Sequence, residues 1–151
     1  MRHEGIAAVL TIALFLSACG DPCEEKVDRD FLAKAAAEEG AIQTESGLVY
    51  KVLKSGYGPK PEAGDRVTVH YKGMLADGTV FDSSLDRSPV RLSLEQVIPG
   101  WAEGLQMMKG GGMVRLVVPP HLGYGRKGHL PKIPSCAVLV FEIELFGIEG
   151  G

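Results

Sequence analysis

The chain has 151 residues and a formal net charge of −3, with 45% hydrophobic and 23% charged residues. This length and composition suit one globular domain with a short extension. A faintly acidic chain lacks the basic surface by which proteins bind nucleic acid, so we expect no nucleic-acid partner.

Residues 1–18 are typical of a signal peptide. Arg2 precedes an apolar run from Ile6 to Leu16, which is shorter than the roughly 20 residues of a membrane-spanning helix. The run leads into Leu16-Ser17-Ala18-Cys19, which resembles the lipobox of bacterial lipoproteins. In such proteins cleavage precedes the cysteine, which then carries acyl chains such as palmitate. The resemblance implies that Cys19 is lipidated and holds the mature chain on a membrane. An ordinary signal peptide with a chance cysteine is the alternative.

Residues 19–46 are predicted to form a lipidated tether and a short helix. The helix is expected over residues 24–39, which are rich in Ala, Glu and Lys, with Val27, Phe31 and Ala35 spaced four apart on one side. Because this apolar stripe is narrow, we expect the helix to pack weakly or to be the remnant of a dimerisation segment.

Two cysteines remain if Cys19 is lipidated. Cys23 lies in the tether and Cys136 lies just before an expected core strand. In an oxidising compartment they can form a disulfide. Two free thiols, or a Cys23–Cys23 bond between chains, are equally compatible with the sequence.

The globular domain is predicted to cover residues 47–149. It starts with a strand at residues 47–54, followed by a loop rich in Gly and Pro. Residues 67–84 then predict a β-hairpin, because apolar and polar side chains alternate along the first strand and Asp77-Gly78 favours a tight turn.

The hairpin predicts one apolar face with a single carboxylate at its rim. Tyr71 on the first strand and Phe81 on the second can stand on the same face, and Asp82 follows directly after Phe81. His70 points to the face opposite Tyr71, so we expect it to be structural or exposed.

The remaining elements are a strand at residues 90–94, a helix at 101–108, and strands at 113–118 and 137–146. A long loop with several prolines and glycines joins the last two strands. One short helix cannot provide the crossovers of a parallel sheet. We therefore predict an α+β fold in which a mostly antiparallel sheet wraps around that helix.

Four motifs in this order are similar to those of one known family. The hairpin is followed by VIPGW (97–101), LGYG (122–125) and VLVFEIEL (138–145). Together they closely resemble the FKBP-type peptidyl-prolyl isomerases. The resemblance implies an FKBP-like fold and a rotamase activity, the cis–trans isomerisation of X–Pro bonds that assists protein folding.

Mip-like bacterial lipoproteins of this family carry a long N-terminal dimerisation domain before a similar junction, and only its last turns could be present here. With the lipobox, the resemblance implies a cell-envelope protein that is lipid-anchored to the outer membrane and faces the periplasm or the surface. Gly20, in place of an aspartate directly after Cys19, favours the outer membrane.

The resemblance also assigns the residues of a site. The catalytic residues would be Asp82, Tyr124, Trp101 and Phe81, and the substrate-binding residues would be Tyr71, Val97, Ile98, Phe141, His129 and Ile133. Trp101 would form the floor, Asp82 would lie near the twisting amide, and Tyr124 would donate its hydroxyl to a carbonyl. Taken singly, each aromatic side chain is more often plain core than site, and only their joint occurrence favours a site.

The expected reaction needs no cofactor, and the four histidines show no metal-ligand spacing. Relatives often carry an aromatic side chain in the strand after the hairpin, where this chain has Val90 and Leu92. We therefore expect a less complete pocket wall and an altered affinity for macrolide inhibitors. The expected partners are proline-containing unfolded or exported proteins. A non-catalytic chaperone or a proline-peptide binding module is the alternative function.

Overall fold

The computed structural model describes residues 22–150, so the predicted signal peptide and the lipidation site at Cys19 lie outside the described residues. The elements in chain order are α1 (Arg29–Ala37), β1 (Ala41–Gln43), β2 (Val49–Lys54), β3 (Arg66–Leu75), β4 (Val80–Ser83), β5 (Val90–Ser93), α2 (Pro99–Met107), β6 (Met113–Val118), the short 3-10 helix η1 (Pro120–Leu122) and β7 (Leu139–Glu149). Within residues 22–150, no helix is both long and apolar enough to cross a membrane.

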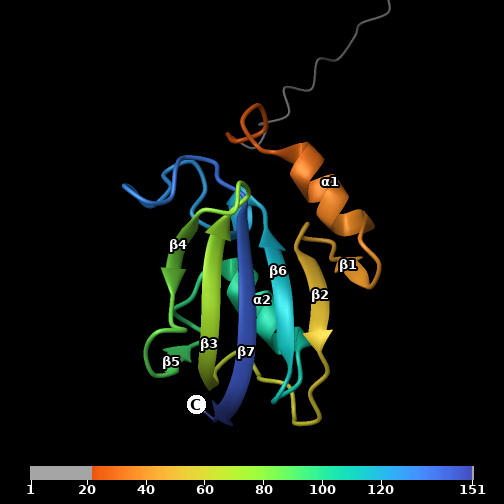
Figure 1. Ribbon diagram of the computed structural model, residues 1–151, viewed down its shortest axis with the longest axis vertical. Helices are drawn as coiled ribbons and strands as arrows, with labels where there is room; N and C mark the ends of the chain where they lie inside the picture. Colours follow the sequence, from red (N-terminus) through yellow and green to blue (C-terminus); the bar gives the residue numbers. More distant parts are fainter. Residues whose placement is uncertain (1–21, 151) are drawn as a thin grey trace, which may run out of the picture.

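The strands form one antiparallel sheet in the order β1-β2-β6-β7-β3-β4, and β5 pairs with β3 beside this path. The long strands β3 and β7 lie in its centre, and α2 packs on the face behind them in Figure 1. This arrangement confirms the predicted α+β fold with a sheet around a short helix. β1 is a strand that the sequence analysis did not predict.

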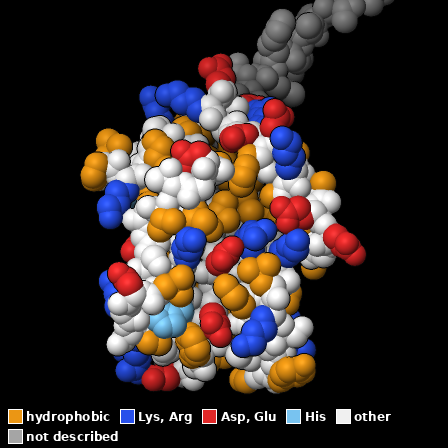
Figure 2. Space-filling model, in the orientation of Figure 1, with side chains coloured by type: hydrophobic (Ala, Val, Ile, Leu, Met, Phe, Trp, Pro, Cys, Tyr) orange, Lys and Arg blue, Asp and Glu red, His pale blue; other side chains and the backbone are white. Residues whose placement is uncertain are grey.

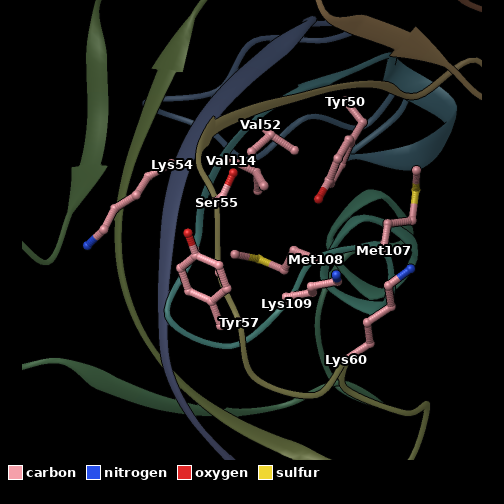
Figure 3. Close-up of a pocket in the computed structure, with 12 residues that line it drawn as sticks. Tyr50, Val52, Lys54, Ser55, Tyr57, Lys60, Met107, Met108, Lys109 and Val114 are labelled. Carbon is pink, nitrogen blue, oxygen red and sulfur yellow. The ribbon is translucent and has the colours of Figure 1, made fainter.

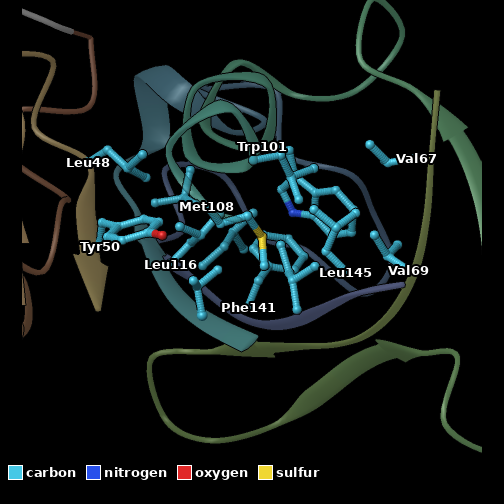
Figure 4. Packing of buried hydrophobic residues seen from close by; sticks show 14 of the residues in the cluster. Leu48, Tyr50, Val67, Val69, Trp101, Met108, Leu116, Phe141 and Leu145 are labelled. Atoms are coloured by element: carbon cyan, nitrogen blue, oxygen red, sulfur yellow. The ribbon is translucent and has the colours of Figure 1, made fainter. Parts of the chain in front are cut away.

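The main hydrophobic core lies between α2 and the inner face of the sheet (Figure 4). Leu105 and Met108 at the end of the helix are fully buried, as are Leu116 on β6 and Leu145 on β7. Helix α2 starts two residues earlier than predicted, because Pro99 occupies its first turn, where a missing N–H costs nothing.

Glycines let α2 lie unusually close to β6. A Cβ on Gly104 would lie only 2.6 Å from Cδ1 of Leu116, and a Cβ on Gly100 only 2.7 Å from Cγ1 of Val118. Leu116 and Val118 are themselves fully buried and have no space to retreat. The helix therefore needs glycine at both positions to reach this depth.

The outer face of the sheet carries a row of charges across four strands (Figure 2). The row consists of cross-strand neighbours in register: Lys72, Glu142, Arg115 and Lys51. Arg115 pairs with Glu142 at 3.4 Å, and Lys51 pairs with Glu38 at 2.9 Å. Partly exposed pairs of this kind contribute little stability each, but they keep this part of the face solvated.

Helix α1 covers the apolar part of the outer face. Phe31, Leu32 and Ala35 pack against a small cluster that includes Val117 and Val140. Ala35 is the one buried residue of α1, and Phe31 and Leu32 are partly buried, so the packing is weak, as the narrow stripe predicted. The helix is shorter than predicted: it begins after Asp28, whose Oδ1 accepts a hydrogen bond from the Phe31 N–H at 2.9 Å, and it ends at Ala37.

Cys23 and Cys136 form a disulfide bond, so the structure selects one of the three alternatives that the sequence left open. Both cysteines are buried. The Cys23 carbonyl also accepts hydrogen bonds from the N–H groups of Lys26 and Val27, each at 2.9 Å. The segment before α1 is thereby fixed to the loop between β6 and β7.

The contact between α2 and β6 predicts that Gly104→Ala destabilises the protein. Alanine favours a helix over glycine, but here the added methyl group would overlap Leu116, at a cost of about 1–3 kcal/mol. Urea unfolding should show a lower midpoint. Gly147→Ala is the matched control, since a Cβ there meets nothing closer than 3.9 Å. Equal midpoints for the two variants would contradict the prediction.

The disulfide predicts a second stability effect. Its two cysteines are 113 residues apart in sequence, so breaking the bond frees a long loop in the unfolded chain. The double variant Cys23→Ala, Cys136→Ala should lose about 2–4 kcal/mol of unfolding free energy. Reducing agent should lower the urea midpoint of the unmodified protein and leave that of the double variant unchanged. A midpoint insensitive to reduction in both proteins would show that the bond does not stabilise the fold.

Candidate active site

The β3–β4 hairpin positions the first part of the site. Its tight turn contains Gly78 at φ +89°, as the Asp-Gly pair predicted. Gly73 on β3 lies under the Phe81 ring, where a Cβ would approach Cζ of Phe81 to 2.7 Å. The ring can therefore lie against the backbone of β3, and Asp82 follows at the edge of the sheet.

Four aromatic rings meet at the N-terminal end of α2. The Trp101 ring contacts Tyr71 and Phe141 edge-to-face, each with ring centroids 5.3 Å apart. Phe81 contacts Phe141 in the same manner at 5.6 Å. Such edge-to-face pairs hold each other's orientation, so the rings form a preformed apolar surface.

These rings line a cavity of about 370 Å³, a size suited to a small ligand or a short peptide segment. Its lining consists of Tyr71, Phe81, Asp82, Leu92, Gln96, Val97, Ile98, Trp101, Tyr124 and Phe141. Eight of the ten residues proposed from the sequence are therefore brought together here. Leu92 and Gln96 are the other two lining residues. Leu92 was noted from the sequence only because relatives often carry an aromatic side chain there, and Gln96 was not predicted.

The other two proposed residues, His129 and Ile133, line an adjoining hollow of about 410 Å³. This hollow shares Phe81, Asp82 and Tyr124 with the first cavity. The His129 ring stacks on that of Tyr124 at a centroid distance of 5.2 Å. The two depressions thus form one continuous site with Asp82 and Tyr124 between them.

The polar edge of the site is a network of three side chains. The Tyr71 hydroxyl donates a hydrogen bond to Asp82 Oδ2 at 2.5 Å. Arg87 Nη2 donates to the Tyr71 hydroxyl at 3.3 Å and lies 3.5 Å from Asp82 Oδ1. Burial, with the hydrogen bond to Asp82 as the second cause, raises the pKa of Tyr71 to about 12. The carboxylate is thus held at the rim with a fixed orientation.

Ser84 is a supporting residue that the sequence analysis missed. It is fully buried, and its Oγ accepts a hydrogen bond from the Tyr71 N–H at 2.9 Å. The same oxygen lies 2.9 Å from Nδ1 of His70, whose ring contacts Phe146. The sequence left open whether His70 is structural or exposed, and these contacts favour the structural role. Nothing in the sequence around Ser84 indicates that this serine is buried.

The floor of the site is a buried indole ring. Trp101 is 5% exposed, and its Nε1–H is the one buried side-chain polar group that has no hydrogen-bond partner within residues 22–150. In the same part of the chain, no three His, Cys, Asp or Glu side chains are grouped so that they could hold a metal ion. The chemistry that these residues offer is therefore an apolar surface with one carboxylate and two phenolic hydroxyls at its rim.

Comparison with known proteins gives a consistent result. The sequence model of the FKBP-type peptidyl-prolyl cis-trans isomerases matches residues 58–146. The FKBP-type isomerase FkpA of Aeromonas hydrophila is 51% identical over 126 residues, which are 83% of this chain and 47% of that protein. This chain thus spans about half the length of the curated FkpA relatives that it matches.

Solved structures give the same picture. The crystal structure of FkpA from Escherichia coli is 44% identical, with a TM-score of 0.77 over 80% of this chain and 57% of that one. The crystal structure of a peptidyl-prolyl cis-trans isomerase from Pseudomonas syringae is 40% identical, with a TM-score of 0.76 over 80% of this chain and 90% of that one. The FKBP-like fold is therefore confirmed.

The pKa of Tyr71 predicts how stability depends on alkaline pH. An unfolded tyrosine has a pKa of about 10, and the folded chain raises it to about 12. Between these values the folded state keeps a proton that the unfolded state has lost, so stability is complete below about pH 10 and falls as pH rises towards 12. Urea unfolding from pH 9 to 12 should show this fall.

The Tyr71→Phe variant should show a flatter pH profile than Tyr57→Phe, in which an exposed tyrosine is changed instead. Burial also raises the pKa of Tyr50, so Tyr50 adds the same fall in stability at alkaline pH to both variants. Identical profiles for the two variants would contradict the assignment to Tyr71.

Proposed function

Because the chain belongs to the FKBP-type peptidyl-prolyl cis-trans isomerase family, we propose that it accelerates rotation about X–Pro bonds in exported polypeptides. The observation that carries this proposal is the aromatic cavity above Trp101 with the Tyr71–Asp82 pair at its rim. Proline-containing unfolded or exported proteins are the substrates.

The cavity supports a mechanism without covalent chemistry. Amide resonance opposes rotation with a barrier of about 18–20 kcal/mol. The planar amide is strongly dipolar and is well solvated by water, whereas the twisted amide has lost much of its charge separation. A dry aromatic cavity therefore disfavours the planar form more than the twisted one, which is selective stabilisation of the transition state.

The polar groups at the rim have separate roles in this proposal. Tyr124, a residue that is 38% exposed, donates a hydrogen bond from its hydroxyl to a substrate carbonyl. Asp82 presents a fixed negative charge to the twisting amide, and Tyr71 holds the orientation of that carboxylate through its hydrogen bond. Phe81 and Trp101 enclose the proline ring.

We further propose that residues 1–18 are a removed lipoprotein signal peptide and that Cys19 carries lipid. Residues 19–46 would form the tether with its short helix, and residues 47–149 the isomerase domain. The protein would then reside in the cell envelope, held at the outer membrane and facing the periplasm or the surface. The support is the Leu16-Ser17-Ala18-Cys19 sequence together with Gly20.

Macrolide inhibitors are a second ligand class for the same cavity. Leu92 occupies the wall that an aromatic side chain closes in many relatives, so this wall offers less flat surface. We therefore propose weaker macrolide binding than in relatives with that aromatic. The single tryptophan, Trp101, provides an intrinsic fluorescence signal for measuring it.

The isomerase proposal predicts that Asp82→Ala and Tyr124→Phe both lower kcat/KM on X–Pro peptides. Loss of a hydrogen bond to a charged or polar transition-state group costs about 1.5–3 kcal/mol, or roughly tenfold to a hundredfold in rate. The assay is peptide isomerisation followed optically with the purified chain.

The matched controls are Asp86→Ala, which removes an exposed carboxylate in the loop that follows β4, and Tyr57→Phe, which changes a tyrosine outside the cavity. Both controls should retain full activity. Background rates for the unmodified chain and for every variant, with peptide binding preserved, would instead identify a non-catalytic chaperone or proline-peptide binding module.

The lipid proposal predicts that Cys19→Ala releases the protein from the membrane fraction of expressing cells. Acylation provides the hydrophobic anchor, and without it the described residues offer no membrane-spanning helix. Fractionation and metabolic labelling with palmitate measure the two effects. Labelling of the Cys19→Ala variant, or its continued sedimentation with membranes, would refute the proposal.

A further inference from the structure

A second cavity, of about 420 Å³, lies at the opposite end of α2 (Figure 3). It is bounded by the end of β2 and the loop that follows, by the last turn of α2, and by the start of β6. Its side chains come from Tyr50, Val52, Lys54, Ser55, Tyr57, Lys60, Met107, Met108, Lys109 and Val114. It shares no residue with the aromatic cavity around Trp101.

The charges at this cavity all have one sign. Three lysines line it, and none of its lining residues is acidic. Lys54 points away from the cavity in Figure 3 and lies 3.5 Å from Glu144. Lys60 and Lys109 form no ion pair with any of residues 22–150. The cavity is thus complementary to a negatively charged group.

The inner wall of the cavity is apolar and adaptable. Tyr50 is buried, its hydroxyl points towards the cavity in Figure 3, and burial raises the pKa of that hydroxyl. The partly buried Met107 supplies a flexible thioether side chain, which suits a surface that accepts varied apolar partners, and the fully buried Met108 belongs to both this wall and the core. The wall therefore favours a ligand that combines an apolar side chain with an acidic one.

An unpaired strand edge borders the same cavity. β1 pairs with β2 only from Val49 to Lys51, and no strand among the described residues continues along that edge past Lys51. Val52 is exposed on this edge, and its side chain lines the cavity. An unpaired edge of this kind binds extended polypeptide by adding a strand to the sheet.

We propose that this surface binds an extended polypeptide segment that carries an apolar and an acidic side chain two residues apart, on the same face of the added strand. The segment pairs with β2 at Val52–Lys54 and so continues the line of β1. Its apolar side chain enters the cavity beside Tyr50 and Met107. Its carboxylate, two residues along and on the same face, meets Lys60 and Lys109. This site does not require a proline and does not depend on the isomerase activity.

The test uses the full, ¹⁵N-labelled chain and a proline-free peptide with Leu and Glu alternating on one face and Thr on the other. NMR titration should shift the amide signals of residues 51–57 and 107–114 and leave the Trp101 indole signal in place.

The variant Lys60→Glu, Lys109→Glu should bind at least about tenfold more weakly at low salt. The control variant Lys26→Glu, Lys34→Glu makes the same change in net charge near and on α1 and should bind normally.

Two modified peptides separate the parts of the proposal. Replacing Glu by Lys in the peptide should abolish binding, because the lysines then repel it. Methylating alternate backbone nitrogens should also abolish binding, because it removes the hydrogen bonds of an added strand. X–Pro isomerisation of a short peptide by the Lys60→Glu, Lys109→Glu variant should be unchanged, which distinguishes this site from the proline cavity.

Several outcomes would overturn the proposal: no shifts on titration, shifts around Trp101 alone, or equal binding of the methylated peptide. A further alternative is a lipid surface. If vesicles of phosphatidylglycerol bind in a manner that depends on Lys60 and Lys109, while the peptide does not bind, the surface recognises anionic lipid and the polypeptide proposal is wrong.

Discussion

The close contact between α2 and β6 is the constraint on which the rest of the structure depends. With glycine at positions 100 and 104, the helix lies against Val118 and Leu116 without intervening side chains. This depth lets Trp101, one residue after Gly100, reach the rings of Tyr71 and Phe141 on the central strands. A shallower helix would separate those rings and open the floor of the aromatic cavity to water. The same contact therefore fixes the height of the aromatic floor.

The rim of the cavity depends on groups from separate parts of the chain. Asp82 is held by Tyr71 and Arg87, and Tyr71 in turn is held by the buried Ser84. The opposite rim, with Tyr124, belongs to the loop between β6 and β7, which the Cys23–Cys136 bond joins to the segment before α1. The N-terminal segment therefore contributes to the site by restraining one side of its entrance, although it supplies no lining residue.

Sequence patterns predicted most of this fold for identifiable reasons. The alternation in β3, the Asp-Gly turn and the position of Trp101 are local signals, and each survives in the structure. β1 has only three residues and no pattern of its own, because its pairing with β2 depends on the turn that joins them. The patch that α1 contacts could not be predicted from the sequence, because it is assembled from three strands. Ser84 and Gln96 were missed because their positions follow from tertiary contacts, whereas the aromatic residues carried a recognisable motif.

Helix α2 has only nine residues, and a cavity lies at each of its ends. Its axis spans about 13 Å, a distance that an extended chain covers with about four residues. A client segment held at the lysine-lined end would keep a nearby proline at a high effective concentration, of millimolar order, above Trp101. If both proposed sites act together, they form one bivalent attachment, and the spacing between an acidic, apolar stretch and a proline decides which X–Pro bonds are isomerised first.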